Sequence, residues 1–124
     1  MALREGNAIY RIDAKTQAFH RVAGTSEQGY SGDGGSALNA KLSGPKGLAL
    51  SNGHLFIADT ESHTIRAVDL KTGIISTVLG TGSRGDGPEP DPLACKLSRP
   101  HGLFFADGVL YVSDSESHRI RVLR

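Results

Sequence analysis

The chain has 124 residues, the length of a single domain, and its 14 Lys and Arg residues nearly balance its 13 Asp and Glu residues. The net charge of +1 excludes a general electrostatic attraction to nucleic acid or to an anionic membrane. A single cysteine, Cys95, excludes an intramolecular disulfide, and no apolar run is long enough for a signal peptide or a membrane helix. We expect no membrane partner and favour a cytoplasmic location, with the compartment of any longer parent protein left open.

Short apolar runs between glycine-rich turns predict an all-β chain, with a first pair of strands within residues 7–24. The sequence RIDAKTQAFHRVAGT in this region returns as AVDLKTGIISTVLGT at 67–81. The loop that follows is YSGDGG at 30–35. A phosphate-binding loop should open a helix, whereas this loop leads toward the strand sequence KLSGPKGLAL at 41–50. We therefore interpret it as a connection between two structural units.

A complete unit of four strands is predicted for residues 45–82, with strands at 47–50, 54–59, 64–70 and 74–80. The second of these strands, HLFIAD, is apolar at nearly every position. A strand with apolar side chains on both faces must be covered on both faces. The sequence therefore favours small sheets that stack face to face.

The third unit, residues 100–124, is expected to contain three strands that copy the second unit. KLSRPHGLFF at 96–105 copies KLSGPKGLAL, and VSDSESHRIR at 112–121 copies IADTESHTIR at 57–66. A repeat of about 50 residues is typical of propeller blades. This internal repeat is the strongest indication of fold in the sequence.

The order of a Gly-Asp-Gly loop, a Pro-x-Gly segment, an Ala-Asp turn, a His-x-Ile-Arg strand and a Thr-Gly hairpin resembles the NHL repeat over residues 7–124. The resemblance implies a β-propeller of four-stranded antiparallel blades, a fold used mainly as a rigid binding scaffold. Nine predicted strands make an arc of about two and a quarter blades: a partial blade at 7–24, a complete blade at 45–82 and a partial blade at 100–124. The arc has open edges, so we expect either further blades of a longer propeller or ring closure by self-association.

Six polar residues are predicted to hold turns. Two are the acids of the Gly-Asp-Gly loops at 30–35 and 82–90, which we take as equivalent, and the others are the acid and the histidine of each His-x-Ile-Arg copy. An alternative makes each Asp–His pair a ligand pair for a central metal ion, but the recurrence of the pair in both units favours a structural role. The six residues are Asp33, Asp59, Asp86, Asp114, His63 and His118.

Four residues are candidates for binding. Arg66 and Arg121 occupy the same position of two repeats and could bind an anionic ligand. His20 and His101 lie at positions that are not equivalent in the repeats, so each could have a binding role that is specific to one blade. We assign no catalytic residue and no metal ligand, and we expect no cofactor.

Two classes of function remain. The first is a non-catalytic scaffold or binding module for a protein or a small-molecule ligand. The alternative is part of a metal-dependent propeller hydrolase or lyase, for which calcium is a possible metal ion. RNA binding would require aromatic stacking partners, and the chain has only 4 Phe, 3 Tyr and no Trp, so a nucleic-acid partner is not expected.

Overall fold

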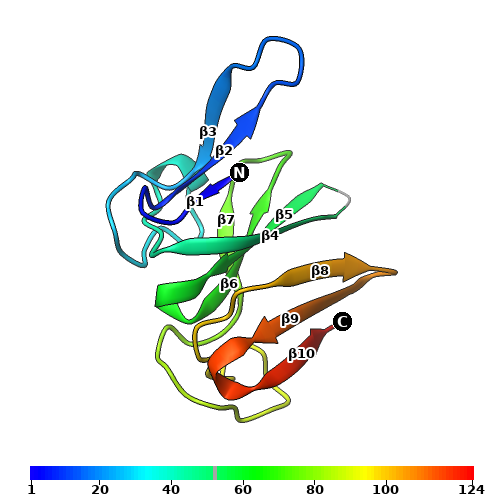
Figure 1. Cartoon of the computed structure of the whole chain (residues 1–124). Coiled ribbons are helices and arrows are strands. Elements are labelled where there is room, and N and C mark those ends of the chain that lie inside the picture. The colour runs from blue at the N-terminus through cyan, green and yellow to red at the C-terminus, as the bar shows by residue number, and fades with distance from the viewer. Residues whose placement is uncertain (52) are drawn as a thin grey trace.

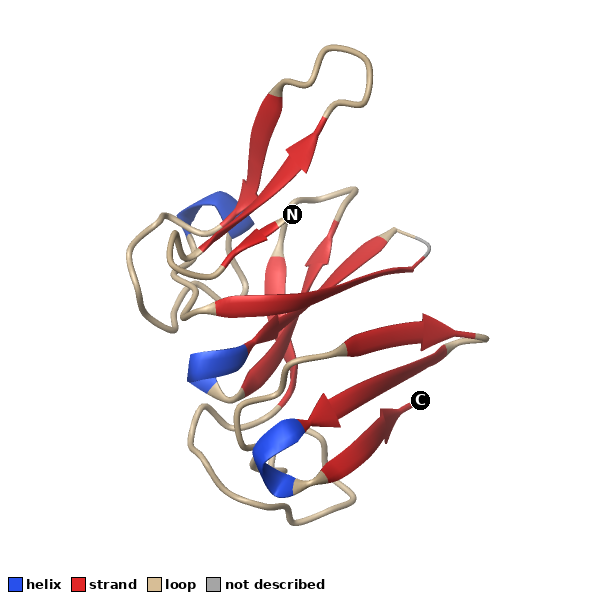
Figure 2. Ribbon diagram, viewed as in Figure 1, coloured by secondary structure: helices blue, strands red, loops and turns tan. Residues whose placement is uncertain are grey.

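A computed structural model describes residues 1–51 and 53–124 (Figure 1). Within these residues the regular structure is antiparallel β-sheet, apart from three short 3-10 turns (Figure 2). Ten strands form three sheets that follow one another along the chain. The all-β fold predicted from the sequence is therefore confirmed.

The strands keep their chain order within each sheet: β1-β2-β3 in the first sheet, β4-β5-β6-β7 in the second and β8-β9-β10 in the third. One 3-10 turn follows the first sheet. Another connects the second and third strands of the second sheet, and the last connects the second and third strands of the third sheet. The bounds of these elements are β1 Ala2–Leu3, β2 Ala8–Ile12, β3 Phe19–Ala23, η1 Ala37–Asn39, β4 Pro45–Ser51, β5 His54–Asp59, η2 Thr60–Ser62, β6 Thr64–Asp69, β7 Ile75–Leu79, β8 Leu103–Ala106, β9 Val109–Asp114, η3 Ser115–Ser117 and β10 Arg119–Leu123.

The structure adds one short strand, β1, to the nine that the sequence predicts. Leu3 of β1 pairs with Ala8, just as Asp59 at the end of β5 pairs with Thr64. β1 is therefore the end of a strand equivalent to β5. The sequence did not reveal it because Leu3 replaces the acid that marks the end of this strand in the other two sheets.

Two apolar clusters hold the three sheets together. The cluster between the first and second sheets contains Ile9, Ile57 and Ile75. The cluster between the second and third sheets contains Ala58 and Leu110. Since Ile57 and Ala58 are neighbours on β5 and enter different clusters, β5 is covered on both faces, as its continuous apolar sequence predicted.

The second and third sheets approach each other closely at Gly47 in β4. A Cβ atom added to Gly47 would lie 2.0 Å from the carbonyl oxygen of His101, which is too close for any atom. Glycine is therefore required here, and its absence of a side chain brings the start of β4 against the segment that leads into β8.

Candidate functional site

Arg66 on β6 joins two loop segments to the second sheet. Its side chain is 0% exposed. The guanidinium donates to the carbonyl oxygens of Lys41 and Ser31, each at 2.8 Å, and to Oδ1 of Asp33 at 2.7 Å. Bonds from a charged donor are about twice as strong as neutral ones, so Arg66 fixes the loop that contains Asp33 against β6.

Asp59 lies beside Arg66 at the end of β5 and is also fully buried. Its Oδ1 accepts the backbone N–H of Ser43 at 2.7 Å, while its Oδ2 lies 3.7 Å from Nη1 of Arg66. Among the residues that the structure describes, neither Asp59 Oδ2 nor Arg66 Nε has a hydrogen-bond partner. Burial raises the pKa of Asp59 to about 6, although the Ser43 amide and the Arg66 charge act in the opposite direction.

Tyr30 covers the outer side of this arrangement. Its ring centroid lies 5.0 Å from Cζ of Arg66, within cation–π range, and its hydroxyl lies 2.6 Å from Oγ1 of Thr77 on β7. Thr77 in turn donates to Oδ2 of Asp33 at 2.5 Å. Thr77 thus ties the loop to the fourth strand of the second sheet, and Arg66 ties the same loop to β6.

The third sheet contains a second arrangement of the same kind around Arg121 on β10. The guanidinium donates to Asp114 at 2.8 Å, to Glu89 at 2.7 Å and to Asp86 at 2.6 Å. Asp114 also accepts the backbone N–H of Ser98 at 2.7 Å, as Asp59 does from Ser43. Hydrogen bonds from Arg121 and Arg119 lower the pKa of Asp86.

The two loops do not align on their Gly-Asp-Gly letters. The backbone N–H of Gly29 and that of Gly85 each donate to a leucine carbonyl at 3.0 Å, so these two glycines are equivalent. The residues that follow them, Tyr30 and Asp86, therefore share one position, and each lies against the arginine of its own sheet.

The expected equivalence of Asp33 and Asp86 is therefore wrong. Three positions further along each loop, Glu89 makes the bond to Arg121 that Asp33 makes to Arg66. The sequence did not single out Glu89. Glu89 lies four residues after Gly85, just as Asp33 lies four residues after Gly29. This spacing could have identified Glu89, but the identical Gly-Asp-Gly sequences of the two loops suggested a different alignment.

His63 and His118 end the two hairpin turns in the left-handed conformation, with φ of 59° and 55°. His63 also reaches the neighbouring sheet, where its Nδ1 accepts the backbone N–H of Arg99 at 3.1 Å. Burial lowers the pKa of His63. Arg99 bridges the turns of both sheets, donating to Glu61 at 2.6 Å and to Glu116 at 3.1 Å.

His101 and His20 lie in different sheets and in different environments. His20 is exposed on β3. His101 is partly buried between the second and third sheets, where its Nε2 lies 3.3 Å from Nζ of Lys46. Burial lowers the pKa of His101, and the positive charges of Lys46 and Arg99 lower it further. Because an ammonium group can only donate, the Nε2 of His101 is the acceptor in its contact with Lys46.

Two further features concern ions and membranes. Across residues 1–51 and 53–124, no group of three or more His, Cys, Asp or Glu side chains is placed to hold a metal ion. In the same residues, no helix has the length and apolar character to cross a membrane.

Small antiparallel sheets that stack on one another through apolar faces are blades of a β-propeller, and this chain is a fragment of one. The family model for the teneurin NHL domain matches residues 21–100, and the family model for the NHL repeat matches residues 97–123. The chain belongs to the NHL-repeat family.

The relatives of the chain are much longer proteins. Protein SUPPRESSOR OF QUENCHING 1, chloroplastic, from Arabidopsis thaliana is 37% identical over 112 residues, which cover 90% of this chain and 10% of that protein. NHL repeat-containing protein 2 from Homo sapiens is 32% identical over 93 residues, which cover 72% of this chain and 13% of that protein. The chain thus spans about a tenth of the length of these curated relatives.

Solved structures share the fold at low sequence identity. A structural genomics protein of unknown function from Bacteroides thetaiotaomicron superposes with a TM-score of 0.85 at 20% identity, over 96% of this chain and 30% of that one. An auxiliary nutrient binding protein from the same organism gives a TM-score of 0.77 at 19% identity, over 98% of this chain and 33% of that one.

Proposed function

We propose that the chain is a non-catalytic binding module, part of a larger NHL propeller, that recognises an anionic group of a protein or a small-molecule ligand through Lys46 and His101. One observation carries this proposal. Lys46 and His101 are the same position of two successive repeats, after the proline of KLSGPKG and of KLSRPHG, and their side chains lie 3.3 Å apart across the junction of the sheets. When His101 is protonated, its Nε2–H and the Lys46 ammonium are two donors at this distance, and they can share one carboxylate or phosphate.

The buried arginines favour this assignment by contrast. Arg66 and Arg121 were the other candidates for an anion site, but their guanidinium groups are engaged by carboxylates and carbonyls of the same chain. We assign them, with Asp59 and Asp114, to the scaffold. The scaffold repeats from sheet to sheet, whereas Lys46 and His101 differ between repeats, which is what a blade-specific recognition surface requires.

We further propose that additional blades, rather than self-association, complete the propeller, with blade boundaries at 7–24, 45–82 and 100–124. This choice is supported by the two solved structures, of which the chain covers 30% and 33%. In those proteins, most of the single polypeptide lies outside the part that matches this chain. The auxiliary nutrient binding protein with this fold supports a binding role. The proposal involves no cofactor.

The proposal predicts anion binding that is linked to the protonation of His101. Acetate and inorganic phosphate should shift the NMR signals of the His101 ring and of the Lys46 side chain in a saturable way. Because a bound anion favours the imidazolium form, it should raise the pKa of His101, and binding should tighten as the pH falls. The Lys46→Met variant should lose the response, while the control variant His20→Gln should keep it.

Two outcomes would contradict the proposal. One is an equal response of His20 and His101, because it would indicate non-specific ion binding. The other is a response to calcium chloride at the carboxylates with none to acetate or phosphate, which would favour the metal-dependent hydrolase or lyase.

A further inference from the structure

The junction between the second and third sheets contains a hydrogen bond that depends on the protonation of a histidine. The backbone N–H of Arg99, in the segment that leads into β8, donates to Nδ1 of His63 at 3.1 Å. An imidazole nitrogen accepts a hydrogen bond only when it carries no proton. The bond therefore exists when His63 is neutral and is lost when the ring becomes an imidazolium.

The junction between the first and second sheets has the same bond without a titratable group. There the N–H of Gly44 donates to Oδ1 of Asn7 at 2.9 Å. Asn7 precedes β2 as His63 precedes β6, and both residues are left-handed, with φ of 49° and 59°. Gly44 and Arg99 likewise hold one position, between the serine and the proline of KLSGP and KLSRP. Since an amide oxygen can close such a junction, the histidine makes the bond sensitive to pH.

The segment that His63 holds also positions His101. Thr60, in the turn that His63 ends, donates from Oγ1 to the carbonyl oxygen of Pro100 at 2.7 Å. The next residue is His101, whose Nε2 lies 3.3 Å from Nζ of Lys46. Loss of the bond to His63 therefore loosens the segment that places His101 opposite Lys46.

The surroundings of His63 favour the neutral ring. Burial lowers the pKa of His63, and the positive charges of Arg84 and Arg99 act in the same direction, against the negative charges of Glu61 and Glu116. Arg84 lies in the loop that precedes β8, while the two glutamates lie in η2 and η3. The ring therefore takes up its proton at a lower pH than an exposed histidine, and the bond is present at neutral pH.

We propose that His63 is a pH-sensitive switch in this junction, whose protonation releases the N–H of Arg99 and so regulates the anion site formed by Lys46 and His101. The regulation of that site rests on the proposed function. The two histidines act in opposite directions, because protonation of His101 adds a donor to the site, whereas protonation of His63 loosens the segment that carries His101. A bound anion favours the imidazolium form of His101, so in the complex we expect His101 to take up its proton at a higher pH than His63.

Amide hydrogen exchange tests the switch without any anion. The protection of the Arg99 amide relative to that of the Gly44 amide should fall roughly three- to tenfold between pH 7.5 and pH 5, which is the effect of losing one hydrogen bond of ordinary strength. In His63→Asn, which copies the first junction, this ratio should stay constant. The matched control His118→Asn changes the same turn position of the third sheet and should keep the fall.

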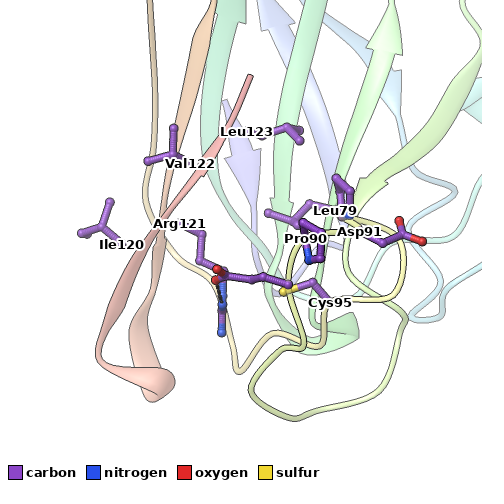
Figure 3. Close-up of a pocket in the computed structure, with 10 residues that line it drawn as sticks. Leu79, Pro90, Asp91, Cys95, Ile120, Arg121, Val122 and Leu123 are labelled. Carbon is purple, nitrogen blue, oxygen red and sulfur yellow. Dashed lines mark hydrogen bonds and ion pairs between the residues drawn. The ribbon is translucent and has the colours of Figure 1, made fainter.

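A reporter at the other edge of the third sheet separates a local change from general acid unfolding. Val122 and Leu123 of β10 line the cavity that Figure 3 shows. Their NMR signals should be the same in the wild-type chain and in His63→Asn at pH 5. A difference there as large as at Arg99 would overturn the inference, as would a protection ratio that is constant in the wild type or falls equally in His63→Asn.

Sulfate, which stays ionised over this pH range, is the probe for the regulated site. In the wild-type chain its affinity should rise and then fall as the pH decreases from 7.5 to 5, whereas in His63→Asn it should rise and level off. A switch that acted only through the charge of His63 would tighten binding, so affinities that rise in the same way in both proteins would overturn the regulation. Binding to neither protein, together with a falling protection ratio at Arg99, would refute the proposed function and leave the switch in the junction supported.

Discussion

Replacing Arg66 by Met tests whether the buried arginine holds the second sheet together. The substitution keeps the length and apolar stem of the side chain but removes its charge and donors. It leaves the carbonyl oxygens of Lys41 and Ser31 without their donor, and it leaves Asp59 buried without a neighbouring cation. A polar group that loses its partner in a buried site carries the full cost of desolvation.

The expected loss can be set from these contacts. Breaking a buried ion pair by removing one partner costs about 3–5 kcal/mol, so we expect Arg66→Met to lower the free energy of unfolding by about 4 kcal/mol. The matched control is Arg119→Met. Arg119 also pairs with a carboxylate, Asp86 at 3.0 Å, but is 57% exposed, so its loss should cost no more than about 1 kcal/mol.

Urea denaturation followed by circular dichroism measures both variants. The penalty for Arg66→Met should be smaller at pH 5 than at pH 7.5, because Asp59, whose pKa burial raises to about 6, can then bind a proton in the folded state. A penalty within about 1 kcal/mol of the Arg119→Met control, or one that does not change with pH, would refute the role given to Arg66.

Two further predictions concern Asp59 and Gly47. Burial raises the pKa of Asp59 from the 3.8 of an exposed aspartate to about 6, so the folded state binds this proton more tightly and the stability that Asp59 contributes falls as the pH rises from about 4 to about 6. The stability of the wild-type chain relative to Asp59→Asn should therefore decrease by up to roughly 3 kcal/mol over this range in urea titrations, and a constant difference would contradict the shift. Gly47→Ala should lower the melting temperature by forcing β4 away from His101, with a cost of about 1–3 kcal/mol. The control Gly35→Ala, where the nearest atom to a new Cβ is 3.4 Å away, should melt close to the parent, and equal melting temperatures for both variants would show that the sheets tolerate separation at Gly47.

The sequence was sufficient for the parts of the fold that depend on repeated local patterns. The four strands of the second sheet lie at 45–51, 54–59, 64–69 and 75–79, within two residues of their predicted positions. These strands could be predicted because apolar runs and turn glycines are local sequence patterns. The same patterns recur in the third sheet. The covering of both faces of β5 followed from the same apolar run.

The features that the sequence did not reveal depend on contacts between distant segments. β1 pairs through only two residues and carries Leu3 in place of the usual acid. Glu89 and Tyr30 were missed because loops of different length can match identical letters in the wrong register, and only the backbone bonds of Gly29 and Gly85 fix that register. Arg66 was a binding candidate by recurrence, and its complete burial follows from a loop that packs over it.

Amide hydrogen exchange of β6 and β10 is the most direct test of the central claim that the second sheet is a complete four-stranded blade, whereas β10 is the edge of a three-stranded sheet in the described residues. We expect strong protection of residues 65–68, which lie between β5 and β7, and weaker protection of the equivalent residues 120–123, which pair with β9 on one side. Equal protection of the two segments would contradict the claim, because β10 would then be paired on both sides.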